Sequence, residues 1–133
     1  MNLSINIATP SREALDTNMG RAITQMAAIV ARNHQRGKLP SGPGLNITFM
    51  LSSQVEKPDF TGMRMGGYTD REKVLYFEKA VPEELLQSEK AGSYVTLVLQ
   101  DVIHNASEYF DQYCCLFDRV SWEQWFDQLE FPR

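Results

Sequence analysis

The side chains best suited to chemistry gather in one stretch of the chain, residues 93–113. Read as a helix, this stretch places four of them on one polar face: Asp101, His104, Glu108 and Asp111. Carboxylate and imidazole groups three or four residues apart can share a proton or bind a metal ion. A metal site in a helical protein also needs ligands from a facing helix, and the only other histidine, His34, suits a structural role at a helix end. We therefore interpret the face as exposed surface. The alternative is a small hydrolase or metal-dependent enzyme that uses Asp101, His104 and Glu108.

Other catalytic and cofactor motifs do not match the sequence. Cys114 and Cys115 have no expected histidine partner, and their acidic neighbours disfavour the reactive thiolate. There is no G-x-S-x-G elbow for a serine nucleophile. The segment KLPSGPG at 38–44 does not have the spacing of a phosphate-binding loop. We expect a protein that is not an enzyme and that needs no cofactor and no metal.

Charge is distributed unevenly along the chain, although the net charge is only −4. Residues 1–45 contain five basic and two acidic side chains, a balance of +3. Residues 99–133 contain two basic and seven acidic side chains, a balance of −5. An acidic surface repels nucleic acid and attracts basic proteins. We expect no nucleic-acid partner, and the open alternative is an acidic face that serves only solubility.

The sequence also favours a cytoplasmic protein without a membrane partner. No apolar run approaches the roughly 20 residues that span a bilayer. The segment MNLSINIATP lacks the basic and apolar regions of a signal peptide. The two cysteines are adjacent, rarely bond to each other in that position, and have no third cysteine to pair with, as is typical of a reducing compartment.

The periodicity of apolar residues predicts one domain, 1–133, of the α+β class. We expect a two-layer sandwich in which helices pack on one face of a small mixed sheet of about three strands. Two strands that follow each other are expected to pair antiparallel. Gly20, inside the first helix, indicates a close packing contact. The elements run strand 3–7, helix 9–36, strand 45–51, strand 73–81, short helix from Pro82, helix 93–113 capped by Ser93, and a last helix capped by Ser121 with Gln124.

Two further segments combine features of core and of contact surface. The polar loop 52–67 contains Phe60, Met63 and Met65, and flexible methionines can pack against a partner. Alternatively, Phe60 and Met63 fold back over the core. The last helix has an apolar stripe of Trp122, Trp125, Phe126 and Leu129, which is typical of core but would also suit the seam of a homodimer.

The combined pattern favours a protein-binding surface at the acidic end of the chain. Aromatic residues dominate the energetics of protein interfaces, and carboxylates steer basic partners. From charge and aromatic placement we expect nine contact residues: Asp101, His104, Glu108, Asp111, Asp118, Trp122, Phe60, Met63 and Met65. Such a surface would suit occlusion of a positively charged active site.

The chain begins with a strand and a long helix ending ARNHQRGKLPSGPG, which are followed by the strand LNITFML, the segment VLYFEKAVPEELL and the acidic helix QDVIHNASEYFDQY. Over nearly its whole length this layout resembles the immunity proteins of bacterial polymorphic-toxin systems. The resemblance implies tight, non-covalent neutralisation of one cognate protein toxin in the producing cell. The toxin would have a basic active site.

Overall fold

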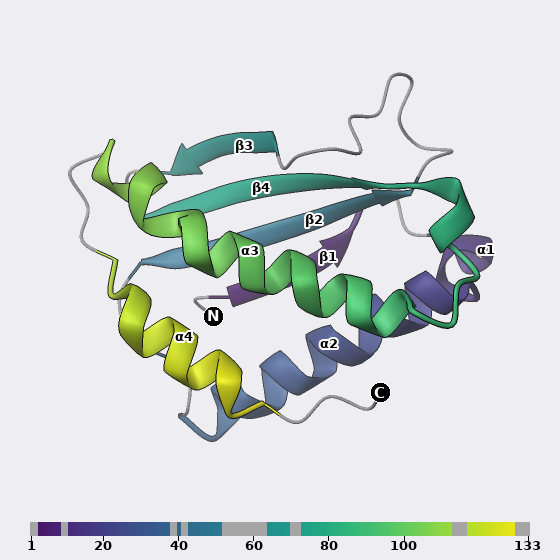
Figure 1. The fold of residues 1–133 in the computed structure, drawn as a ribbon, viewed down its shortest axis with the longest axis horizontal. Helices are drawn as coiled ribbons and strands as arrows, with labels where there is room; N and C mark the ends of the chain where they lie inside the picture. Colours follow the sequence, from purple (N-terminus) through teal and green to yellow (C-terminus); the bar gives the residue numbers. More distant parts are fainter. Residues whose placement is uncertain are drawn as a thin grey trace.

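A mixed four-stranded sheet with helices against one of its faces forms the frame of the protein (Figure 1). The computed structural model describes residues 3–8, 11–37, 40, 43–51, 64–69, 73–112 and 117–129, with the backbone alone at 64–69. Its elements are β1 (Leu3–Ile7), α1 (Arg12–Leu15), α2 (Asn18–Gln35), β2 (Gly44–Leu51), β3 (Arg64–Thr69), β4 (Val74–Val81), the 3₁₀ helix η2 (Glu83–Leu85), α3 (Ala91–Asp111) and α4 (Arg119–Asp127). The predicted α+β class and mixed sheet are confirmed.

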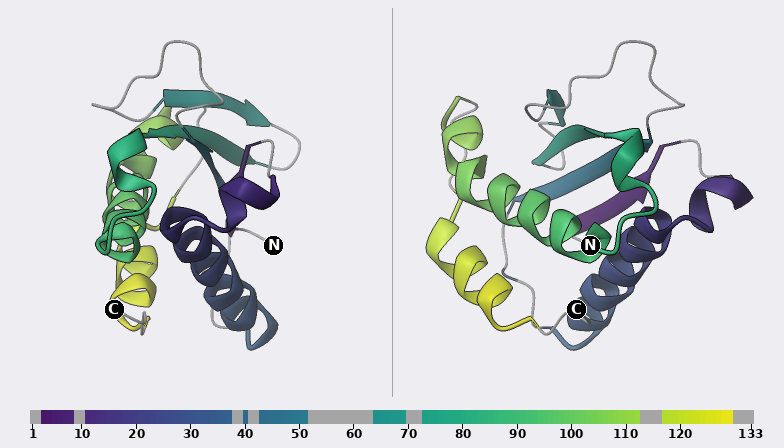
Figure 2. Two further views of the ribbon diagram at one scale, coloured as in Figure 1. Left: turned by 90° about the vertical axis from the view of Figure 1, so that its right-hand side faces the viewer. Right: turned by 45° about the vertical axis from the view of Figure 1, so that its right-hand side comes forward.

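The strands lie in the order β1-β2-β4-β3. Strands β1, β2 and β4 are parallel, and β3 runs antiparallel to β4 at the far edge. Helix α2 makes the crossover from β1 to β2, as a parallel pair requires. Figure 2 shows α2 and α3 on the same side of the sheet, where they also contact each other.

Alternation along the strands decides which face carries the core. In β2, Leu45, Ile47 and Phe49 are buried, while Asn46 and Thr48 point to the opposite face. The buried side chains of the sheet and the helices form one cluster. Helix α3 contributes the largest helical share, with Ala91, Val95, Val98, Leu99, Val102, Ile103, Ala106 and Phe110.

The expectation that the second and third predicted strands pair antiparallel is wrong. They correspond to β2 and β4, which are parallel. The chain passes through β3 between them, and β3 runs antiparallel to β4, so the chain has reversed its direction before β4 begins. The predicted loop 52–67 overlaps β3 by four residues, 64–67. The sequence RMGGYT has no apolar alternation, and its glycines fall at a register shift between Met65 and Gly67, where a bulge is tolerated.

Helix boundaries differ from the predicted ones because other residues cap the ends. The expected helix 9–36 is divided into α1 and α2, and the Thr17 hydroxyl accepts the Gly20 N–H at 2.9 Å to begin α2. Thr9 and Pro10 lie outside the described residues. Helix α3 begins at Ala91, so Ser93 is not its cap. The predicted short helix after Pro82 is the single turn η2.

A row of aromatic rings in contact, two pairs stacked and one edge to face, attaches α4 to the end of α3. Ring centroids are 5.1 Å apart for Phe110 and Phe117, 5.5 Å for Phe117 and Trp122, and 5.6 Å for Trp122 and Trp125. The indole N–H groups of both tryptophans are buried and have no hydrogen-bond partner among the described residues. Ring packing, rather than polar pairing of the indoles, therefore holds α4 in place.

Asp118, rather than Ser121, caps α4. Its carboxylate accepts the Ser121 hydroxyl at 2.7 Å and the Ser121 backbone N–H at 3.1 Å. The side-chain hydrogen bond, followed by the backbone one, holds the pKa of Asp118 below its usual value near 3.8. The ionised form is thus favoured by folding.

Gly20 and Gly37 are both needed, for different reasons. A Cβ at Gly20 would collide with the Ala14 carbonyl oxygen and lie 2.9 Å from the Leu15 Cα, which confirms the expected close contact. No described residue other than its chain neighbours lies within 4 Å of a Cβ placed at Gly37, but this glycine has a φ of +65°.

We predict that Gly20→Ala destabilises the protein by about 1–3 kcal/mol, because the backbone of α1 must move. Urea unfolding monitored by circular dichroism measures this change. Gly37→Ala, the comparison variant, should lose about 1 kcal/mol from backbone strain alone. A Gly20→Ala protein that gains the roughly 1 kcal/mol expected from helix propensity would show that α1 does not approach α2 this closely.

We predict that Asp118→Asn, which keeps a capping oxygen but cannot ionise, is less stable than the wild type at pH 7, with a melting temperature lower by a few degrees. The folded pKa is lowered, so the extra stability is complete above the unfolded value near 3.8 and is lost as pH falls through the folded pKa. Melting curves from pH 7 to pH 2 should converge at the acid end. A constant difference across this range would contradict the assignment.

Candidate functional site

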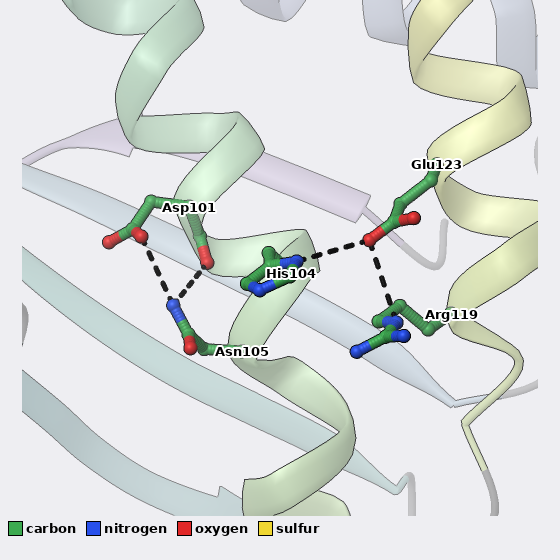
Figure 3. Close-up of polar contacts among 5 residues, drawn as sticks. All are labelled: Asp101, His104, Asn105, Arg119 and Glu123. Atoms are coloured by element: carbon green, nitrogen blue, oxygen red, sulfur yellow. Dashed lines mark hydrogen bonds and ion pairs between the residues drawn. The ribbon is translucent and has the colours of Figure 1, made fainter.

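An open groove of about 440 Å³ lies between α3 and α4. We call it the α3–α4 groove, and it is lined by Leu97, Gln100, Asp101, Ile103 and His104 from α3 and by Glu123, Phe126 and Asp127 from α4. Figure 3 shows Asp101 and His104 on one helix and Glu123 on the other. The cleft between the two helices thus has both acidic and apolar walls.

The same packing that builds the core turns these side chains outward. Helix α3 buries Val98, Leu99 and Val102. The exposed positions on its other face, including 97, 101 and 104, therefore point away from the sheet. Helix α4 buries Trp122, Trp125 and Phe126. Glu123 and Asp127 are four residues apart and therefore share the helix face that borders the groove.

The charge of the groove is negative. Asp101, Glu123 and Asp127 supply three carboxylates, and no lysine or arginine is among the described residues that line it. The Glu123 Oε1 atom lies 3.4 Å from His104 Nδ1 and 3.6 Å from Arg119 Nε (Figure 3). These side chains are 41–64% exposed, so the pairs add little stability and leave the carboxylates accessible.

Local hydrogen bonds orient Asp101. The Asn105 side-chain amide donates to the Asp101 carboxylate at 3.1 Å and to its backbone carbonyl at 2.9 Å (Figure 3). One carboxylate oxygen is engaged by this contact. The carboxylate still retains acceptor sites for an incoming cation.

The apolar part of the groove has a buried floor and an exposed rim. Ile103 and Phe126 are at most 8% exposed, whereas Leu97 is 62% exposed. Single exposed apolar side chains are common on protein surfaces, but Leu97 adjoins the apolar floor of a groove. The groove therefore offers an apolar anchor point next to its carboxylates.

The structure separates the nine expected contact residues into five groups. Asp101 and His104 line the groove, whereas Glu108, Asp111 and Asp118 are exposed outside it. Trp122 is a correction: it is fully buried in the core, because α4 turns its apolar stripe inward. Phe60 and Met63 lie outside the described residues, and Met65 lies in β3 opposite Phe77, with only its backbone described.

The burial of Trp122 and Trp125 distinguishes the two interpretations of the stripe on the last helix, as core or as the seam of a homodimer. Both side chains are at most 6% exposed, which confirms that the stripe is core. These two indoles are therefore not available as the seam of a homodimer. Within the described ranges, no group of three or more His, Cys, Asp or Glu residues is placed to hold a metal ion.

Sequence reasoning missed six of the lining residues: Leu97, Gln100, Ile103, Glu123, Phe126 and Asp127. A signal was present for Leu97. Leu97 falls outside the apolar face of the predicted helix, and a large aliphatic residue in that position is exposed. Glu123 was counted only as one of the acidic residues of 99–133. Its place in the groove depends on how α4 packs on α3.

Two findings concern membrane-spanning helices and similarity to known proteins. None of the described helices is both long and apolar enough to span a bilayer. No family model, curated protein or solved structure matches the chain.

Proposed function

We propose that this protein is a cytoplasmic inhibitor of the immunity-protein type, which binds a basic protein toxin through the α3–α4 groove. The observation that carries this proposal is the groove itself, in which three accessible carboxylates border an apolar wall and the exposed Leu97. A positively charged, partly aliphatic surface is the complement of such a site.

The groove suits a lysine or arginine side chain of the partner. The aliphatic stem of such a side chain would lie on Leu97 and Phe126, while its charged end would reach Asp101, Glu123 or Asp127. Water leaves the groove as the partner enters, and the attraction between the opposite charges becomes stronger in the lower dielectric. The exposed Glu108 and Asp111 extend the negative field along α3 and would steer the approach.

Neutralisation would follow from occupation of the toxin's basic surface. Enzymes that act on phosphate-bearing substrates carry lysine and arginine side chains at their active sites. A protein that pairs with those side chains competes with the substrate. The resemblance in layout to immunity proteins supports this role, and the acidic groove supplies the physical means.

We predict that the triple variant Asp101→Lys, Glu123→Lys and Asp127→Lys binds a toxin encoded beside this gene at least about a hundredfold more weakly, because each attraction becomes a repulsion. Calorimetry measures the affinity, and stopped-flow fluorescence at two salt concentrations measures the association rate. Slower association and a weaker salt dependence are expected.

The matched control for this experiment reverses three exposed acids away from the groove: Glu13→Lys, Asp16→Lys and Glu89→Lys. The change in net charge is the same, so only the position of the charge differs. Equal losses in the two triple variants would reduce the effect to net charge. No binding of the neighbouring toxin by the wild type would remove the proposed role altogether.

We predict that Leu97→Ser weakens the same complex by about tenfold or more, since the side chain would become buried at the centre of the interface. Val120→Ser is the control, because Val120 is 59% exposed on α4 and does not line the groove. Both variants should unfold within about 0.5 kcal/mol of the wild type, as expected for exposed positions. Similar affinities for the two variants would place the contact surface elsewhere.

A further inference from the structure

Strand β1 forms an edge of the sheet that no described strand covers. The order β1-β2-β4-β3 places β2 on one side of β1 and leaves its other side open within the described ranges (Figure 1). Such an edge presents unpaired backbone N–H and C=O groups. Natural proteins usually protect it or use it for binding.

The register identifies which backbone groups face outward. The Ala8 N–H donates to the Phe49 carbonyl of β2 at 2.9 Å. Backbone groups alternate in direction along a strand, so those of Ser4 and Asn6 also point toward β2. The N–H and C=O groups of Ile5 and Ile7 therefore point to the open side, where no described residue bonds to them.

An apolar groove of about 240 Å³ runs beside these groups, and we call it the β1 groove. It is lined by Ile5, Asn6 and Ile7 of β1, Leu15 of α1, and Ile23, Thr24 and Ala27 of α2. Leu15 is 41% exposed. None of the described residues that line the groove is charged, so a charged group placed in it would lose hydration without gaining a counter-charge from them.

We propose that β1 accepts an extended, uncharged segment of another protein as an additional strand, with one branched aliphatic side chain seated in the β1 groove. The outward N–H and C=O groups of Ile5 and Ile7 select an extended backbone, and the uncharged lining selects the side chain. This surface is built from β1, α1 and α2, so it stands independently of the α3–α4 groove.

A second copy of this chain is a poorer occupant than a foreign strand. Leu3 and Ile5 of β1 are at most 8% exposed because they fill the protein's own core. The β1 strand of a second copy therefore has neither of these side chains free for the groove. A segment from another protein carries no such commitment.

The test uses the intact protein and acetylated, amidated heptapeptides Ser-Thr-Thr-Xaa-Thr-Thr-Ser, in which Xaa is Ile, Val, Lys or Glu. Backbone amide shifts in ¹⁵N-labelled protein report where each peptide binds at millimolar concentration. The Ile and Val peptides should shift the amides of Ile5 and Ile7. The Lys and Glu peptides should bind at least about tenfold more weakly.

Two controls separate strand addition from apolar adhesion. The Ile peptide with alternate amides N-methylated keeps its side chains but loses donors, and it should bind at least about tenfold more weakly. Thr24→Arg places a charge over the groove and should weaken binding similarly, whereas Ala28→Arg, exposed on the same helix and outside the lining, should not.

Several results would overturn this proposal. They are the absence of shifts at Ile5 and Ile7 with the Ile and Val peptides, equal binding of the charged peptides, and equal binding of the N-methylated peptide. A dimer in sedimentation equilibrium that Thr24→Arg dissociates and Ala28→Arg does not would assign the edge to a second copy instead.

Discussion

The burial of one face of α3 against α2 and the sheet is the constraint on which the rest of the structure depends. The apolar stripe that includes Val95, Val98 and Val102 fixes the rotation of the helix about its axis. Once that rotation is fixed, Leu97, Asp101 and His104 must face outward. The stacked rings that begin at Phe110 then place α4 opposite this outward face. The groove is thus a consequence of how the core is packed.

The carboxylates of the groove add little to folding, and in the proposed role they act in binding. Among the described residues, the ion pairs around these three accessible acids are exposed and weak, so the acids contribute little to stability. An incoming cationic surface would remove water from them and make their charge effective. Leu97 follows the same logic, because an exposed aliphatic side chain gains its free energy only when a partner covers it. In the proposed role, both features are parts of an interface.

Features that depend on neighbouring residues in the sequence were predicted well. Features that depend on residues far apart in the sequence could not be predicted. The period of α3 identified its buried face, and Gly20 indicated a close contact, because both depend on nearby residues. The parallel pairing of β2 and β4 depends on β3, whose glycine-rich sequence carries no strand period. Asp118 replaced Ser121 as the cap because either residue type serves there. The pairing of Glu123 with His104 required the packing of α4 on α3.

The central claim is that the outward face of α3 and the adjoining face of α4 are the surface at which a basic protein binds. Hydrogen–deuterium exchange of the protein, with and without the toxin encoded beside it, tests this most directly. We expect slower exchange in residues 97–104 and 119–127, with α1 unchanged. Protection confined to other segments, with both of these ranges unaffected, would contradict the account.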